Sequence, residues 1–124
     1  MSTTDQSNDI LILQRQAPYG NSLARDGIDF VLTSAAYDQN ISILFMGDGV
    51  FQLTQNQSSS DLQLKNHAGA LEVLPLYDVE QIFAVEEDLK ARNLGVDDIL
   101  DIAIIITREQ AQSMINQHNK VIGF

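Results

Sequence analysis

The chain has 124 residues, and 44% of them are hydrophobic, which is enough for one hydrophobic core. Seven basic side chains stand against 17 acidic ones, for a formal charge of −10 at pH 7, and acidic residues are in excess in each third of the chain. This charge argues against direct binding of a nucleic-acid backbone. Cysteine is absent, which excludes disulfides, thiolate chemistry and cysteine-bound metals.

Residues 1–8 are polar and show no basic segment followed by an apolar one, so no secretory signal is visible. We expect a flexible polar tail at 1–8 and a single domain at 9–124. No apolar run reaches the ~18 to 20 residues of a membrane span, so we expect a cytoplasmic protein without membrane contact. The acidity indicates solubility, with a basic partner protein as the alternative reading.

Short apolar runs alternate with helical patterns along the whole chain. The predicted strands are residues 9–13, 41–46, 81–85, 99–106 and 121–124. The predicted helices run from Asn21 or Ser22 to near Tyr37, from Asp61 to Leu74 before Pro75, over residues 86–92, and from the capping box at 107–110 onward with Ala111, Met114 and Ile115 inward. Gly27 inside the first of these helices predicts close packing against the sheet. We therefore expect an α/β fold, a three-layer α/β/α sandwich with a mostly parallel sheet of about five strands.

The strand at 41–46 ends in Gly47-Asp48-Gly49, followed by the start of a helix that carries Val50, Phe51 and Leu53. Function in open parallel sheets gathers at the carboxyl ends of strands, so this corner is the first place to look for a site. The third glycine of a dinucleotide-binding fingerprint is missing. A tight strand-to-helix turn, held or capped by Asp48, is the favoured reading, and a small-anion site is the alternative.

Other groups of polar residues give weaker signals. His67 and His118 have no partners at zinc-binding spacing, so we expect packing or surface histidines and no metal or cofactor. Glu86–Asp88 fits the acidic N-terminus of a helix, with a docking face as the alternative. Residues 97–101 carry three aspartates without the glycine of a calcium loop, which favours a solvated loop.

Four stretches, Ala17–Ala36, Met46–Leu53, Leu76–Phe83 and Asn119–Phe124, together resemble the TusC/DsrF-like branch of the DsrE/DsrF/DsrH sulfur-relay family. The resemblance covers nearly all of residues 9–124, in order. It implies a small α/β subunit of a heterohexamer in which three related chains each occur twice, with TusB/DsrH-like and TusD/DsrE-like partners. Such complexes pass persulfide sulfur between cysteines, toward 2-thiouridine at the tRNA wobble position or in sulfur oxidation.

The resemblance also implies where sulfur chemistry occurs in this family. The principal carrier cysteine sits on the TusD/DsrE-like subunit, at the end of a strand just before a helix. By motif position that place falls near Ala84–Val85 here, and neither residue can carry persulfide.

We therefore expect a non-catalytic subunit of a sulfur-relay complex that positions a cysteine-bearing partner, with tRNA thiolation as the favoured pathway. A homodimer is left open for the chain on its own. Expected contact residues are Phe51, Leu76, Tyr77, Glu86 and Glu87. Two alternatives remain at this point: a stand-alone small-anion-binding module using Gly47-Asp48-Gly49, and an enzyme using carboxylates such as Asp48 or Glu86 as acid or base.

Overall fold

A computed structural model describes residues 9–37, 39–55 and 62–124, and the side chains of all of these except 62–65. Within these residues, five strands form one sheet in the order β4-β3-β2-β1-β5, and every neighbouring pair is parallel. The strands are β1 (Asp9–Gln14), β2 (Asn40–Phe45), β3 (Gln81–Val85), β4 (Ile104–Ile106) and β5 (Lys120–Gly123). The predicted tail at 1–8 and the predicted cap Asp61 lie outside the described residues.

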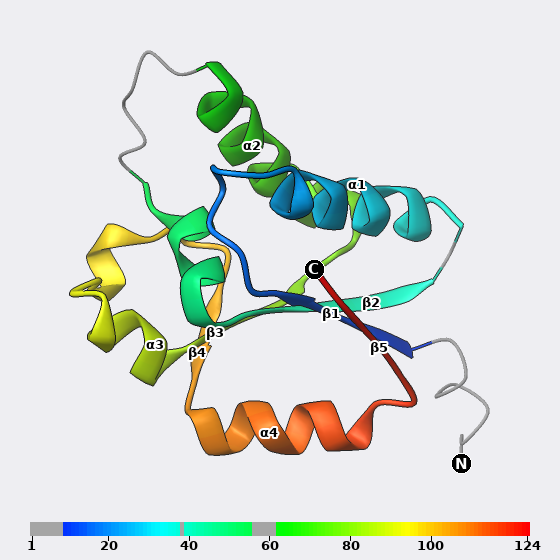
Figure 1. Ribbon diagram of the computed structural model, residues 1–124. Coiled ribbons are helices and arrows are strands. Elements are labelled where there is room, and N and C mark those ends of the chain that lie inside the picture. Colours follow the sequence, from blue (N-terminus) through cyan, green and yellow to red (C-terminus); the bar gives the residue numbers. More distant parts are fainter. Residues whose placement is uncertain (1–8, 38, 56–61) are drawn as a thin grey trace.

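Helices lie on both sides of the sheet, which confirms the predicted three-layer α/β/α sandwich (Figure 1). On one side are α1 (Leu23–Ala35) and α2 (Leu62–Glu72), and on the other is α4 (Arg108–Gln117). The short α3 (Glu86–Ala91) follows β3 directly. Three 3-10 segments complete the described elements: η2 (Gly47–Leu53), η3 (Leu74–Tyr77) and η4 (Val96–Asp98).

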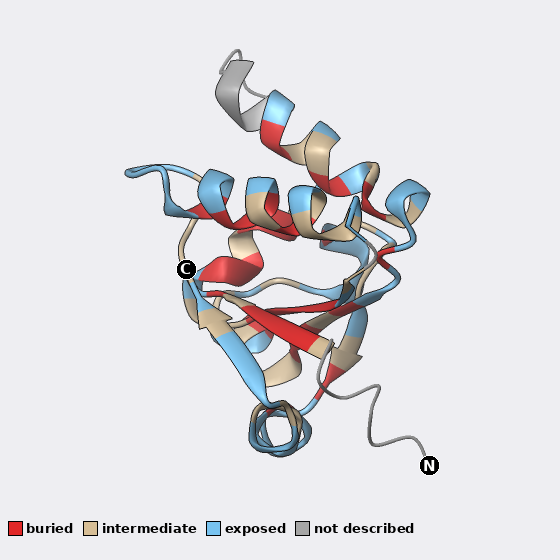
Figure 2. Cartoon of the chain, turned by 90° about the vertical axis from the view of Figure 1, so that its right-hand side faces the viewer, coloured by how far each residue is buried: buried red, intermediate tan, exposed pale blue. Residues whose placement is uncertain are grey.

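The two faces of the sheet bury unequal cores because side chains along a strand alternate between faces. The larger core lies on the side of α1 and α2 and includes Ile10, Ile12, Ile28, Val31, Ile41, Ile43, Phe45, Val50, Leu53, Leu71, Leu74 and Ile82. The smaller core lies under α4 and consists of Leu11, Leu44, Val85, Ile106 and Ala111, with half-buried neighbours. Figure 2 shows the consequence, because buried residues fill the central strands of the sheet and the inner side of α1, whereas the edge strand β5 and helix α4 are mostly exposed or intermediate.

Helix α1 packs tightly on the sheet, as its sequence predicted. Ala24, Ile28 and Val31 are buried at helical spacing, and Ile28 and Val31 belong to the larger core. A Cβ added to Gly27 would stand 2.3 Å from the side-chain amide nitrogen of Gln14, which confirms that this glycine permits close approach to β1. Asn21 supports the start of the helix, since its side-chain oxygen accepts a hydrogen bond from Leu23 N at 2.9 Å.

The strand predicted over 99–106 was wrong in its first half. Leu100 N donates to Leu53 O at 2.8 Å and Gln55 N donates to Asp98 O at 2.9 Å, so this segment forms an antiparallel bridge with the residues after η2. A turn at residues 101–102 follows, and β4 begins only at Ile104. An apolar run shows that a segment is buried, but not which neighbour it pairs with.

The helix predicted after the Gly47–Gly49 corner is a 3-10 segment, η2, and α2 ends at Glu72, two residues before the predicted Leu74. Pro75 explains the second difference, because it occupies the first turn of the separate segment η3. The capping box at Thr107 and Gln110 is confirmed. Thr107 Oγ1 accepts from Gln110 N at 3.1 Å, and Thr107 N donates to Gln110 Oε1 at 2.9 Å.

Candidate functional site at the carboxyl ends of the strands

The corner Gly47–Gly49 follows β2 and lies against the backbone at the end of β1. Gly47 adopts a left-handed conformation (φ 55°), which favours glycine. A Cβ on Gly49 would stand 1.9 Å from the backbone oxygen of Gln14, so only glycine fits at this close approach of two backbones. The following residues Val50 and Leu53 are fully buried. The corner is therefore the tight strand-to-helix turn that the sequence favoured.

The amide groups of both glycines of this corner already have acceptors inside the protein. Gly47 N donates to Asp88 Oδ2 at 2.8 Å, and Gly49 N donates to Met46 O at 2.9 Å. The carboxylates of Asp48 and Asp88 also stand at this edge, and negative charge there opposes an incoming anion. The geometry thus gives no support to the small-anion alternative.

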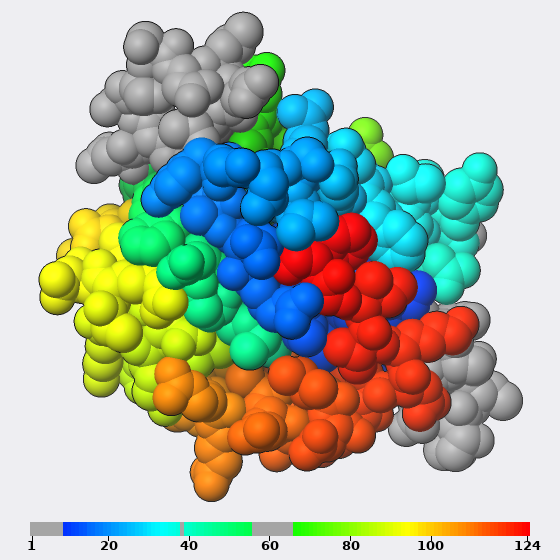
Figure 3. Space-filling view, in the orientation of Figure 1, coloured from blue at the N-terminus to red at the C-terminus, as the bar shows by residue number. Residues whose placement is uncertain are grey.

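Asp88 joins three elements at this edge, and its side chain is only 13% exposed. Its carboxylate accepts the Gly47 amide of η2 and pairs with Arg108 Nη2 of α4 at 2.8 Å and with Arg92 Nη1 at 3.9 Å. Arg92 also pairs with Asp48 at 3.0 Å. In Figure 3, η2, α3 and the start of α4 meet on the left of the molecule, where these groups connect them.

The acidic run Glu86–Asp88 forms the first turn of α3, as predicted, but its members have different partners. Glu86 forms a long ion pair with Lys90 (3.9 Å), and Glu87 accepts a hydrogen bond from Arg108 N at 2.7 Å, which connects α3 to the first turn of α4. The sequence alone did not single out Asp88. Its i,i+4 spacing to Arg92 was a visible signal, whereas the contact with Arg108, 20 residues away, was not.

The end of β3 holds the place to which the family resemblance assigned the carrier cysteine. Ala84 and Val85 are 0% and 1% exposed there, and both contribute to the cores. A cavity of about 130 Å³ adjoins this strand end, and its lining includes Met46, Val85, Asp88 and Arg108. Neither Ala84 nor Val85 has a nucleophilic atom, so this strand end cannot bind sulfur covalently.

The five predicted contact residues do not form one surface. Phe51, Glu86 and Glu87 follow β2 and β3 at their carboxyl ends, whereas Leu76 and Tyr77 precede β3 and lie off the opposite end of the sheet. Phe51 is half-buried, with the Arg92 guanidinium 6.0 Å from its ring centre. Leu76 is 81% exposed and Tyr77 is 50% exposed.

A chain of buried polar side chains escaped the sequence analysis. Gln14 and Gln52 are fully buried, and Gln52 Nε2 donates to Gln14 Oε1 at 3.1 Å and to Gln16 O at 2.8 Å. Gln52 Oε1 lies 2.8 Å from Nε2 of His67. Since the amide nitrogen of Gln52 already donates to two carbonyl oxygens, its oxygen is the acceptor and His67 Nε2 carries the hydrogen. Burial, the larger cause, and the positive charge of Arg25 lower the pKa of His67, while Asp29 opposes the shift.

His67 is thus a packing histidine, as the sequence favoured. In the described part of the chain, no three His, Cys, Asp or Glu side chains gather in a way that could hold a metal ion. A search of the same residues for a helix long and apolar enough to cross a membrane finds none.

Comparison with known proteins identifies the family. The model of the DsrE/DsrF-like family matches residues 8–124. The chain is 37% identical over 112 residues to a "Protein TusC homolog" of Vibrio parahaemolyticus, covering 90% of this chain and 95% of that protein. It is 39% identical over 128 residues to the "Intracellular sulfur oxidation protein DsrF" of Allochromatium vinosum, covering 92% and 94%.

Solved structures support the fold. The ychN protein from E. coli superimposes with a TM-score of 0.78 at 18% sequence identity, over 94% of this chain and 98% of that one. The family model and both relatives extend over nearly the whole chain, including the Gly47–Gly49 corner and the end of β3. The chain belongs to the DsrE/DsrF-like family.

Proposed function

We propose that this protein is a non-catalytic subunit of a cytoplasmic sulfur-relay complex, in which it positions a cysteine-bearing partner for sulfur transfer toward 2-thiouridine at the tRNA wobble position. The expected partners are TusB/DsrH-like and TusD/DsrE-like subunits in a heterohexamer. The similarity to proteins named TusC and DsrF supports a place in such a complex.

One observation carries the non-catalytic part of this proposal. The strand end to which the resemblance assigns the carrier cysteine is filled by Ala84 and Val85, and both are buried. Their side chains complete the hydrophobic cores on the two faces of β3. The chain has no cysteine at any other position either, and persulfide transfer needs a thiolate. Sulfur must therefore be carried by another chain.

Expressing this chain with the two related subunits tests the proposal. We expect the three to purify together, and we expect persulfide transfer from the TusD/DsrE-like cysteine to an acceptor protein to be faster with this chain than without it. If this chain does not purify with either subunit, the proposal fails. If it does, but transfer proceeds equally well without it, a positioning role is excluded.

The pathway needs a separate measurement. In cells that lack this chain, we expect the 2-thiouridine content of tRNA to fall and to recover when the gene is returned. The matched control returns a variant that cannot join the complex. An unchanged 2-thiouridine content, together with impaired oxidation of stored or reduced sulfur, would instead assign the chain to sulfur oxidation.

Leu76 and Tyr77 are the predicted contact residues whose side chains are the most exposed, and we propose that they contact a partner subunit. We extend this proposal to Phe51, Glu86 and Glu87, although each of these also has a partner within the chain. The replacement of Leu76 and Tyr77 by serine leaves the buried Leu74 of η3 untouched. We expect this double variant to fold normally and to bind the partner subunits more weakly.

A further inference from the structure

One face of the sheet is covered incompletely. Parallel sheets normally have helices over both faces, and the α1 side has two long helices. On the other side, within the described residues, α4 has no second helix beside it, and the core under it includes Val85 and Ile106 at the carboxyl ends of β3 and β4 but not Ile104 at the start of β4. At the border of this core lies the cross-strand pair Phe83 and Ile104, which are register partners. Phe83 is half-buried and Ile104 is 52% exposed.

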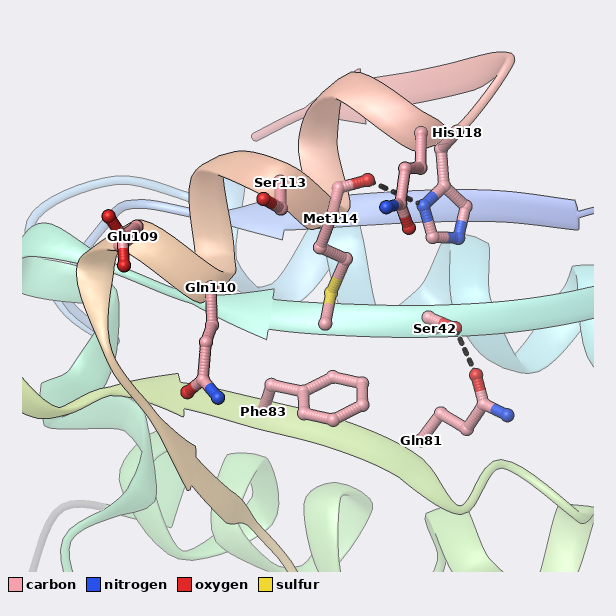
Figure 4. A pocket seen from close by; sticks show the side chains of 9 residues that line it. Ser42, Gln81, Phe83, Glu109, Gln110, Ser113, Met114 and His118 are labelled. Atoms are coloured by element: carbon pink, nitrogen blue, oxygen red, sulfur yellow. Dashed lines mark hydrogen bonds between the residues drawn. The ribbon is translucent and has the colours of Figure 1, made fainter.

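A groove runs between α4 and this part of the sheet, with a volume of about 420 Å³ (Figure 4). Its floor is formed by Ser42, Gln81 and Phe83 of β2 and β3, and the hydroxyl of Ser42 donates to Gln81 Oε1 at 2.8 Å. Met114 and Gln110 extend from α4 toward that floor, as Figure 4 shows. The groove thus has α4 as one wall and two apolar side chains, Phe83 and Met114, among polar lining residues.

The charges around the groove indicate the kind of partner. Its lining contains the carboxylate of Glu109 but no lysine or arginine. Arg108, the nearest cation on α4, is paired with Asp88 at 2.8 Å. The exposed side chains of Glu80 and Asp101 precede the parallel strands β3 and β4, so both carboxylates stand at the amino-terminal end of the Phe83–Ile104 pair, whereas Glu109 follows β4 at the opposite end. With a net charge of −10, a second copy of this chain would be repelled.

We propose that this groove, with the Phe83–Ile104 pair, is the docking site for an amphipathic helix of a less acidic protein, with apolar side chains toward the sheet and lysine or arginine near its ends. Such a helix would take the place of the missing second helix and bury Phe83, Ile104 and Met114. The inference rests on the proposed function in one respect, because it takes the helix to belong to a partner subunit of the complex.

The chain has no cysteine, so a single introduced cysteine reports on one position only. Ser113→Cys is a nearly isosteric change in the groove lining, and Asn116→Cys is its matched control on the exposed side of α4 that does not line the groove. Each variant is treated with a maleimide, alone and with the two related subunits, and the adduct on this chain is measured by mass spectrometry. We expect the complex to slow modification of Ser113→Cys at least tenfold and to leave Asn116→Cys unchanged.

Charge substitutions on the two edge strands give an independent test. Ile104→Lys disrupts the proposed site, and Val121→Lys is the matched control, because Val121 is 37% exposed and is paired with Leu11 of the α4-side core on the opposite edge. We expect Ile104→Lys to reduce recovery of the complex at least tenfold and Val121→Lys to have no effect. Circular dichroism verifies that both variants are folded.

Three outcomes distinguish a failure of the proposed function from a failure of the proposed docking site. If the unmodified chain does not bind the related subunits, the proposed function fails and the docking site loses its partner. If the chain binds but Ile104→Lys and Val121→Lys bind equally well, and Ser113→Cys is not protected, the complex exists and the docking site is wrong. Weaker binding of the native complex at higher salt is expected, and salt independence would contradict the basic partner helix.

Discussion

Gly49 fits the Gly47–Gly49 corner only because it has no Cβ. Because a Cβ would lie 1.9 Å from Gln14 O, the two backbones would have to separate in Gly49→Ala. We expect this variant to lose about 3 kcal/mol or more of unfolding free energy, at the upper end of the cost of overpacking. Urea denaturation of the purified variants measures the loss.

Gly69 provides the matched control for that prediction. It lies in α2, and a Cβ there would meet nothing within 4 Å. Gly69→Ala should therefore stabilise the protein by about 1 kcal/mol through its higher helix propensity. Equal effects of the two substitutions would show that the corner is less tightly packed than described.

His67 makes stability depend on pH. Burial and Arg25 lower its pKa in the folded protein below the value of about 6.5 in the unfolded chain, so the unfolded chain takes up the proton first as pH falls. Its contribution to stability is thus lost as pH drops below about 6.5, down to the lowered pKa. Above that range both states are neutral, and His67 adds no pH dependence.

His67→Gln removes this titration while keeping a group that can hydrogen-bond to Gln52. Between pH 7.5 and 5.5, we expect the unfolding free energy of the wild type to decrease more than that of His67→Gln. NMR titration of the imidazole nitrogens measures the pKa directly and identifies the tautomer with hydrogen on Nε2. A pKa at or above 6.5 in the folded protein would contradict this account.

Asp88 connects neighbouring elements and also pairs with Arg92 at the end of its own helix. In Asp88→Ala the amide of Gly47 loses its acceptor, and Arg108 and Arg92 lose a shared carboxylate. We expect a loss of about 2 kcal/mol in unfolding free energy, since an unsatisfied, partly buried donor is costly.

Asp48→Ala is the control for that change. Asp48 also pairs with Arg92, but its side chain is 62% exposed, so its removal should cost less than about 1 kcal/mol. Thermal or chemical denaturation of both variants at low and at moderate salt makes the comparison. If both variants lose the same stability, Asp88 does not act as a link between η2, α3 and α4.

Elements were predictable from the sequence where a local pattern determined them. The strand at 81–85 was predicted with its observed bounds, because alanine and valine end it and three acidic residues begin the next helix. The capping box of α4 was predictable because both partners lie three residues apart. The bridge between Thr54 and Ile99 was not, because it joins segments 45 residues apart that carry no mark of their pairing.

The candidate site was predictable only where neighbouring residues in the sequence determined it. Gly47 and Gly49 were visible as a turn, yet the oxygen of Gln14 that makes Gly49 necessary belongs to another strand. Likewise, the polar residues Gln14, Gln52 and His67 resemble surface residues in the sequence, and only the fold brings them into one buried chain.

The order of the strands predicts which parts of the sheet unfold locally and which unfold only with the whole molecule. β2 lies at the centre of the sheet, is paired with β1 and β3, and is buried from Ile41 to Phe45. We expect its amides to exchange with solvent most slowly, through global unfolding, and those of the edge strand β4 to exchange faster by local opening. Native-state hydrogen exchange measures both. Comparable protection of β4 and β2 would contradict this description.

Ala84 and Val85 have one more consequence. In a protein whose relatives include an "Intracellular sulfur oxidation protein", this strand end holds no atom that peroxide or a polysulfide can attack. The thioethers of Met46 and Met114, both half-buried, are the described side chains most open to oxidation, and neither forms a mixed disulfide. With no thiol, the chain cannot form or lose a disulfide when its surroundings change from reducing to oxidising.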